Sequence, residues 1–190
     1  MDKNLNEFIE HIESVSPDQT SVLFKNHKLN QCFLIMSIKG SHNKIMILNP
    51  EDDFCDIATI LYAIRGNKTY IASIEVNEDY QQNGFGRLLF EIALAHTDLC
   101  GLTLAYGDVD PINSIKGVSN VEGTTYEDEK TALIAIYQKL GCTYNETTNR
   151  FHQKWKSGEK IKHANPLVLK IANILAEKDG FSLTDQNQPQ

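Results

Sequence analysis

The chain has 190 residues, of which 41% are hydrophobic and 23% charged, a balance typical of globular proteins rather than disordered ones. Eighteen Lys and Arg residues against 25 Asp and Glu residues give a formal net charge of −7, which disfavours nucleic acid as a partner. The polar, acidic start lacks the order of a signal peptide and no apolar run approaches the ~20 residues that span a bilayer, so we expect a cytoplasmic protein with no membrane partner.

Cysteine and histidine positions give no sign of a metal or a disulfide framework. The four cysteines include no close pair, and the six histidines show no metal-ligand spacing. We therefore expect reduced thiols and no metal. Since a chain of this length is about one domain, we predict a single domain over residues 1–180 and a disordered tail over residues 181–190.

The first third of the chain predicts helix, strands and helix in turn. Apolar residues recur at helical spacing over residues 4–15, which predicts an amphipathic helix. Residues 21–24, 31–38 and 44–48 are short apolar runs separated by polar turns, which predicts an antiparallel meander. Residues 52–65 begin with acidic side chains and place isoleucine and leucine at helical spacing, so we predict a short helix there.

The stretch from Lys68 to Thr97 predicts a strand, a glycine-bearing turn and a helix in immediate succession. β-Branched and aromatic residues fill the strand up to Val76, and a helical pattern of apolar residues begins at Leu88. The turn between them contains Gly84 and Gly86, which let the backbone come close to a ligand. Because the turn opens a helix, its unpaired N–H groups and the positive end of the helix dipole face one small volume that attracts phosphate.

The rest of the chain predicts mixed elements around one long loop. A strand joined to the 68–76 strand by a helix is expected to lie parallel to it. The elements are a parallel strand at 102–106, a loop at 108–128, a helix at 130–140 ending before Gly141, a hairpin of 142–145 with 151–155, and a helix from 165 to about 178.

Two segments of the sequence, the glycine-bearing turn and the end of the helix before Gly141, resemble the signatures of a known protein family. Gln81-x-x-Gly84-x-Gly86 resembles the Gln/Arg-x-x-Gly-x-Gly/Ala signature of the GCN5-related N-acetyltransferase (GNAT) family, in which the loop holds the pyrophosphate of acetyl-coenzyme A (acetyl-CoA). Tyr137-Gln-Lys-Leu-Gly141 is similar to the second family signature, and the resemblance covers about residues 68–155. A Rossmann dinucleotide site does not fit, because leucine stands where its third glycine is needed.

The resemblance implies a fold and a set of cofactor contacts. The fold is α/β (α+β), with a mixed, mostly antiparallel sheet flanked by helices, a splayed central pair of strands and, here, an extra C-terminal helix. Main-chain groups of the strand would contact the pantetheine arm and thioester, loop amides would surround the pyrophosphate, and Gln81 would shape the turn. The implied acetyl-CoA residues are Ile74, Glu75, Val76, Gln81, Gln82, Asn83, Gly84, Phe85, Gly86 and Arg87.

Tyr137 aligns with the family tyrosine whose hydroxyl reaches the coenzyme sulfur, so the resemblance implies a general acid there. The residues identify no general base. Glu75 lies on the donor strand and is retained as a catalytic candidate, and Asp108 and Asp110 follow the parallel strand. Glu75 is equally explained as an exposed strand residue, and the two aspartates as turn formers.

Three positions depart from the family pattern. Tyr70 stands where some relatives carry a glutamate, which weakens a protein-lysine substrate. Lys130 replaces an asparagine that contacts the coenzyme in many relatives, and Cys142 replaces a phenylalanine. Separately, four lysines and two histidines cluster within 152–163, which we interpret as a solvated hairpin end, with a phosphate or acidic-partner site as the alternative.

The sequence therefore predicts an N-acetyltransferase that transfers the acetyl group of acetyl-CoA directly to a primary amine of a small molecule or peptide. The acidic net charge mildly favours a small cationic acceptor. The alternative is a non-catalytic acetyl-CoA-binding or protein-interaction module of the same fold. The acidic net charge disfavours a tRNA-directed enzyme. The predicted C-terminal helix lies beyond the usual core and offers a surface for a homodimer.

Overall fold

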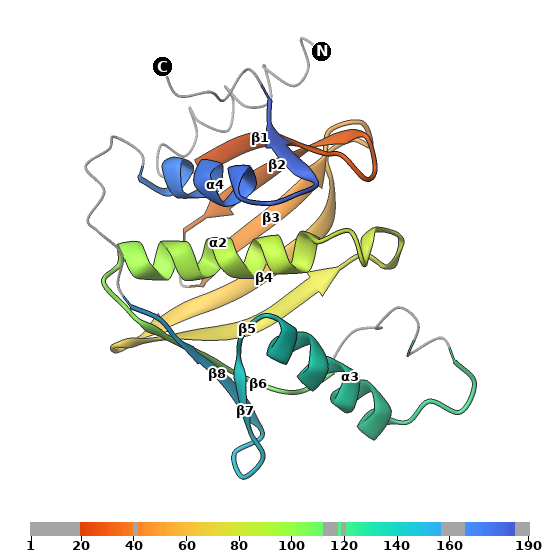
Figure 1. Ribbon diagram of the computed structural model, residues 1–190, viewed down its shortest axis with the longest axis vertical. Helices are drawn as coiled ribbons and strands as arrows, with labels where there is room; N and C mark the ends of the chain where they lie inside the picture. The colour runs from red at the N-terminus through yellow and green to blue at the C-terminus, as the bar shows by residue number, and fades with distance from the viewer. Residues whose placement is uncertain (1–19, 40–41, 112–117, 119–120, 157–165, 185–190) are drawn as a thin grey trace.

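The computed structural model describes residues 20–39, 42–111, 118, 121–156 and 166–184 (Figure 1). In this part of the chain nine strands form one sheet in the order β7-β8-β6-β5-β4-β3-β2-β1-β9. The strands are β1 (Thr20–Asn26), β2 (Gln31–Ile38), β3 (Asn43–Asn49), β4 (Cys55–Arg65), β5 (Lys68–Val76), β6 (Leu104–Asp108), β7 (Thr143–Asn145), β8 (Arg150–Lys154) and β9 (Phe181–Leu183). The helices are η1 (Glu78–Tyr80), α2 (Phe85–Leu99), α3 (Tyr126–Lys139) and α4 (Pro166–Ala176).

The sheet is mixed and mostly antiparallel, as predicted. Every pairing between its neighbours is antiparallel except that of β5 with β6, which is parallel because α2 crosses between them. In Figure 1, α2 and α4 lie side by side across one face of the sheet, and α3 stands apart beside β6 and β7. This confirms the predicted fold class, including the C-terminal helix.

The main core lies between the sheet and α2. Leu88, Leu89 and Ile92 of the helix are fully buried, and the rings of Phe24, Phe33, Phe85 and Phe181 pack together beneath its first turn. Alternate residues of β1–β3 point to the other face, where Leu23, Leu34, Met36, Met46 and Leu48 form a second apolar cluster. Both faces of the meander are therefore apolar.

The predicted helix over residues 52–65 is wrong, because this segment forms strand β4. Residues before it form a turn in which Cys55 N–H donates to the Asp52 carbonyl, and both Asp53 and Phe54 have positive φ. The segment is rich in β-branched residues, and β4 lies between β3 and β5 with Ile57, Ile60 and Tyr62 buried. Tertiary pairing overrides the helical spacing that the sequence presents.

The predicted disordered tail over 181–190 is wrong for its first three residues, which form β9 and pair with β1; residues 185–190 lie outside the described residues. The preceding helix α4 and the turn after it are held on α2 by two ion pairs, Lys170 of α4 with Asp98 and Lys178 of the turn with Glu91. Residues 181–183 are therefore part of the sheet. The predicted helix over 4–15 lies outside the described residues.

Helix α3 begins four residues before the predicted start at 130. Thr125 accepts from the Asp128 N–H and the Asp128 carboxylate accepts from the Thr125 N–H, which is a reciprocal capping box. The helix ends before Gly141, whose φ of 87° favours glycine, as the sequence predicted.

Replacing Phe181 by Ala should lower the free energy of unfolding, because the ring fills space beneath the start of α2. Since the ring is only partly buried, we expect a loss of about 2–3 kcal/mol, less than for a fully buried ring. Chemical denaturation measures this change. Val121→Ala, which truncates a side chain that is 58% exposed, is the control and should have little effect. Equal effects of the two substitutions would contradict the packing role of Phe181.

Candidate functional site

Strands β5 and β6 diverge after two residue pairs. Thr69 pairs with Ala105 and Tyr70 with Tyr106, after which β6 follows β8 while β5 follows β4. Gly107 allows this geometry, because a Cβ at this position would lie 2.7 Å from the Ile71 carbonyl oxygen and 2.6 Å from the Phe151 ring. The register of β5 against β4 also shifts at Ala72, a bulge that bends the strand. The edge of β5 beyond Tyr70 is therefore not paired with β6.

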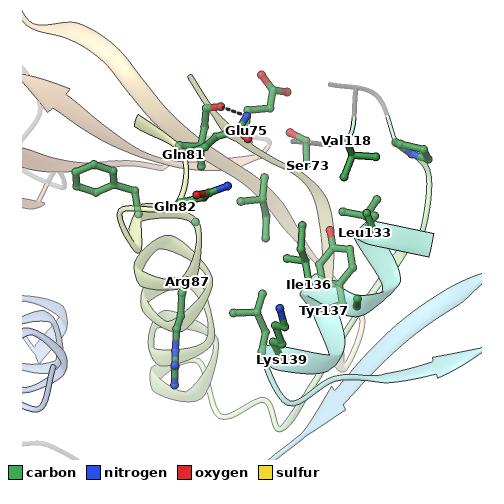
Figure 2. Close-up of a pocket in the computed structure, with 18 of the residues that line it drawn as sticks. Ser73, Glu75, Gln81, Gln82, Arg87, Val118, Leu133, Ile136, Tyr137 and Lys139 are labelled. Atoms are coloured by element: carbon green, nitrogen blue, oxygen red, sulfur yellow. Dashed lines mark hydrogen bonds between the residues drawn. The ribbon is translucent and has the colours of Figure 1, made fainter. Parts of the chain in front are cut away.

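A cleft of about 760 Å³ occupies the space left by this divergence (Figure 2). One wall is β5 from Ala72 to Val76, followed by the glycine turn and the start of α2. The opposite wall is α3, which contributes Leu133, Ile136 and Tyr137. The volume lies within the ~300–1,000 Å³ typical of ligand pockets. Because α3 turns apolar side chains to this space and Ile136 remains 40% exposed, the cleft suits a ligand with an apolar portion.

The glycine turn is held in place from several directions. Gly84 has a φ of 86° and precedes the first turn of α2, and a Cβ there would lie 3.2 Å from the Phe181 ring. Asn26 donates to the Asn83 carbonyl at 3.2 Å, and Lys28 Nζ donates to the Gln82 carbonyl at 3.1 Å. The first intrahelical bond runs from Leu88 N–H to the Gly84 carbonyl, so the preceding amides open α2 without helical partners. The turn is a preformed set of N–H donors.

The structure brings nearly all of the predicted coenzyme residues to the cleft. Gln81 Nε2 donates to the Val76 carbonyl at 3.1 Å and so closes the turn. Asn83 does not line the cleft, because its side chain donates to the carbonyls of Tyr80 and Gln81. The predicted residues that line it are Ile74, Glu75, Val76, Gln81, Gln82, Gly84, Phe85, Gly86 and Arg87.

Tyr137 lies on α3 facing β5 (Figure 2). Its ring is stacked on Phe151 at 3.8 Å between centroids. The residue is only 7% exposed, and burial raises its pKa well above the ordinary value, with smaller effects of Cys142 and Tyr70. The phenol therefore stays protonated at neutral pH. The stacking fixes its direction, so the hydroxyl is a positioned hydrogen-bond donor.

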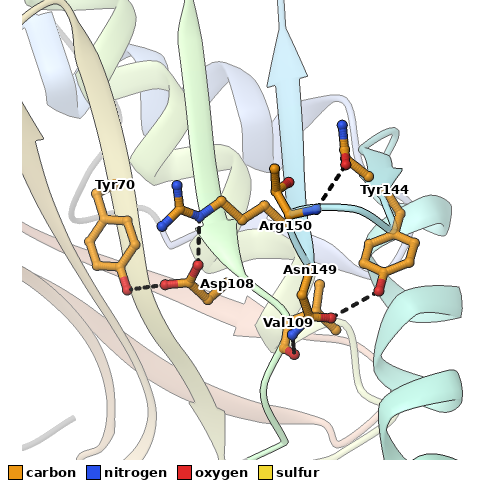
Figure 3. A network of polar contacts seen from close by, with 8 residues as sticks. Tyr70, Asp108, Val109, Tyr144, Asn149 and Arg150 are labelled. Atoms are coloured by element: carbon orange, nitrogen blue, oxygen red, sulfur yellow. Dashed lines mark hydrogen bonds and ion pairs between the residues drawn. The ribbon is translucent and has the colours of Figure 1, made fainter.

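Asp108, a candidate that the sequence left open, lies at the point where the strands diverge. Its carboxylate accepts from Arg150 Nε at 2.7 Å and from the Tyr70 hydroxyl at 3.0 Å (Figure 3). The Arg150 hydrogen bond lowers the pKa of Asp108. Burial opposes this effect in part, and the Tyr70 bond and nearby positive charge lower the pKa further. Asp108 is therefore a stable negative charge at the cleft mouth.

The other carboxylates differ in their surroundings. Glu75 is exposed on the β5 wall, and Asp110 accepts from the Tyr126 hydroxyl at 2.7 Å. Sequence reasoning missed two further cleft residues, Ser73 and Lys139. The Ser73 hydroxyl is buried and makes no hydrogen bond within the described residues. Lys139 belongs to the second signature, which could have indicated it, whereas nothing local marks Ser73.

The described residues were also compared with the requirements of metal binding and membrane insertion. Among these residues no group of three or more His, Cys, Asp or Glu side chains could hold a metal ion. None of the described helices is long and apolar enough to cross a bilayer.

Comparison with solved structures gives similar folds at low sequence identity. A cAMP-binding acyltransferase from Mycobacterium smegmatis matches with a TM-score of 0.55 and 9% identity over 90% of this chain and 61% of that chain. An acetyltransferase of the GNAT family from Staphylococcus aureus Mu50 matches with a TM-score of 0.45 and 12% identity over 82% and 81% of the two chains. PaiA N-acetyltransferase from Thermoplasma acidophilum, in complex with coenzyme A, matches with a TM-score of 0.44 and 16% identity over 59% and 60%.

The fold of this chain is similar to that of the M. smegmatis acyltransferase, and at 9% identity this match shows the fold alone. The mixed sheet, the diverging β5 and β6 and the glycine turn that opens α2 agree with the GNAT-like fold that the sequence resemblance implied. The chain spans about three fifths of the M. smegmatis and T. acidophilum proteins. Comparisons with protein-family models and with curated protein sequences find no match.

Arg150→Gln should raise the pKa of Asp108, because it removes the main interaction that favours the carboxylate. A carboxylate with a lowered folded-state pKa stabilises the fold at pH above its unfolded value of ~3.9 and loses that contribution as pH falls through the folded value. The variant should therefore lose less of its stability on acidification below pH ~4. Carbon-13 NMR titration of the carboxyl groups and denaturation at several pH values measure both effects.

Lys44→Gln is the matched control, since it breaks another exposed ion pair, with Asp56, on a different part of the sheet. It should leave the titration of Asp108 unchanged. An unaltered Asp108 titration in Arg150→Gln would refute the assigned cause of the pKa shift.

Proposed function

We propose that this chain is an acetyl-CoA-dependent N-acetyltransferase that acetylates a primary amine by direct attack. Three features that meet at one cleft support the proposal. They are the edge of β5 that is not paired with β6, the amides of the glycine turn and the side chain of Tyr137. Acyl transfer needs a held donor, a polarised carbonyl and a proton for the leaving thiolate. Each of the three features can meet one of these needs.

The residues present fit acetyl-CoA. The start of α2 offers N–H donors and a positive dipole end to a pyrophosphate, with Arg87 and Lys139 on the rim of the cleft. The apolar wall of Leu133 and Ile136 suits the pantetheine arm. The buried Ser73 hydroxyl lacks a partner among the described residues, and a polar group of the ligand would satisfy it. When bound, acetyl-CoA supplies the acetyl thioester.

The residues of the chain then divide the remaining roles. The free edge of β5 can donate a backbone N–H to the carbonyl and so stabilise negative charge on its oxygen. Tyr137, which stays protonated at neutral pH, can donate a hydrogen bond and then its proton to the departing thiolate, because its ring is held in place by stacking on Phe151. Asp108 remains ionised and attracts the amine, whereas Glu75, exposed on the cleft wall, is the candidate base for its proton.

One observation favours a non-catalytic coenzyme-binding module as the second candidate. Asp108 is bonded to Arg150 and Tyr70, and Asp110 to Tyr126, so two of the three candidate bases are already occupied. The acceptor amine in this proposal belongs either to a small molecule or to a peptide. Release of free thiol from acetyl-CoA with a panel of amines separates an enzyme from a binding module.

Gly84→Ala should weaken acetyl-CoA binding about tenfold or more, because a Cβ at this left-handed residue also meets the Phe181 ring and displaces the turn. Isothermal calorimetry measures the affinity. Gly101→Ala is the matched control at the other end of α2, since Gly101 has a φ of 76° but nothing within 4 Å of the added Cβ. Equal losses of affinity in the two variants, or no binding by the native chain, would contradict the proposed site.

Tyr137→Phe should lower kcat about 100-fold and leave the affinity for acetyl-CoA unchanged, because it removes the donated proton but keeps the stacked ring. Thiol release and calorimetry measure the two quantities. Tyr144→Phe removes a hydroxyl that bonds Asn149 outside the cleft and should retain full turnover. Equal turnover in Tyr137→Phe and the native chain would remove Tyr137 as the acid.

A further inference from the structure

A second hollow of about 350 Å³ lies on the other face of the sheet, opposite α2 and α3. Phe151 of β8 points toward the helices, where it packs on Phe90 and Tyr137. Since neighbouring strand residues point to opposite faces, Arg150, His152 and Lys154 point the other way and line the hollow. The complete lining is Lys68, Leu104, Tyr106, Asn145, Thr148, Arg150, Phe151, His152 and Lys154.

The hollow is positively charged in a chain whose formal net charge is −7. Lys68, Arg150 and Lys154 contribute cations, and none of the lining residues is acidic. Within the described residues neither Lys68 nor Lys154 forms an ion pair with a carboxylate. Arg150 is paired with Asp108, but Lys68 and Lys154 have no such counter-charge, so an anion would be bound favourably beside them.

Arg150 is held in a geometry suited to an oxyanion. Its Nε donates to Asp108 (Figure 3), and its guanidinium lies 5.8 Å from the centre of the Tyr106 ring. Tyr106 is packed on Tyr70 at 5.3 Å, and the Arg65 guanidinium covers Tyr70 at 4.1 Å. The bond to Asp108 uses only Nε, which leaves the terminal nitrogens of Arg150 as a fork for carboxylate or phosphate oxygens.

The same ion pair joins the hollow to the cleft. Asp108 lines the cleft and Arg150 lines the hollow, and the two atoms that connect them are 2.7 Å apart. A small molecule at the divergence of β5 and β6 can therefore present an amine to Asp108 and a negative group to Arg150. The hollow is small and the chain as a whole repels polyanions, which disfavours a nucleic acid or a large acidic protein.

We infer that the hollow formed by Lys68, Arg150, His152 and Lys154 binds a compact oxyanion, a phosphate or carboxylate group, carried by the amine acceptor. The acceptor is thus a small amine with an anionic end, which modifies the cationic acceptor that net charge alone favoured. This inference rests on the proposed function for the identity of the amine, but the anion site itself does not depend on catalysis.

The test follows the imidazole NMR signals of His152 while inorganic phosphate is added at constant ionic strength and pH. Coenzyme A is present in excess, so that the glycine turn is not the site of phosphate binding. We expect a saturable shift, weakened about two- to fivefold in Lys68→Gln and in Lys154→Gln. Lys39→Gln, which removes an exposed lysine elsewhere, should behave as the native chain. A linear shift, or equal curves for all four proteins, would overturn the anion site.

Matched amines then decide the link to the acceptor by the same His152 readout, which needs no turnover. Aminoethyl phosphate is compared with aminoethanol, and β-alanine with propylamine. Tighter binding of the phosphate or the carboxylate member supports the inference and identifies the group, whereas no advantage for either would overturn it. Failure of coenzyme A to bind in calorimetry would instead remove the proposed function and leave the phosphate titration readable.

Discussion

The separation of β5 from β6 is the constraint on which the site depends. β6 is paired with β8 along its whole length but with β5 at only two positions, so it turns away and leaves main-chain groups of β5 without a strand partner. Gly107 makes the departure sterically feasible, since no side chain fits between Ile71 and Phe151. Unpaired backbone groups in a half-buried edge need hydrogen bonds from another source. The cleft therefore exists because the sheet is incomplete there.

The glycine turn gains its rigidity from residues far away in the sequence. Phe181 of β9 packs against Gly84, while Asn26 and Lys28 of the first hairpin bond to the carbonyls of Asn83 and Gln82. These contacts occupy two carbonyls of the turn, while the amides before Leu88 have no helical partner. Preorganised donors avoid reorganisation when a charged group arrives. Phe181 thus supports the turn without lining the cleft.

Local signals in the sequence predicted the elements that form one wall of the cleft, but they were insufficient for part of the sheet. The strand ending at Val76, the glycine turn and α2 were predicted because their cues lie within one short stretch. β4 was predicted as a helix because Ile57, Ile60 and Ile64 follow helical spacing, and only the pairing with β3 and β5 makes the segment a strand. β9 has three residues and is defined by its partner β1, so nothing in its own sequence reveals it. The role of Asp108 was equally hidden, since its partner Arg150 lies 42 positions away.

The charges around Asp108 show why net charge is a poor guide to a local site. The chain is acidic, but the face that bears Arg150, Lys68 and Lys154 carries positive charge, and Arg150 Nε lies 2.7 Å from Asp108 of the cleft. Coulomb interactions at such distances exceed those with charges beyond ~8–10 Å, which salt screens. Asp108 is then the boundary between two environments, because its carboxylate lines the cleft while its partner Arg150 lines the hollow. A molecule recognised at both positions would need opposite charges at its two ends.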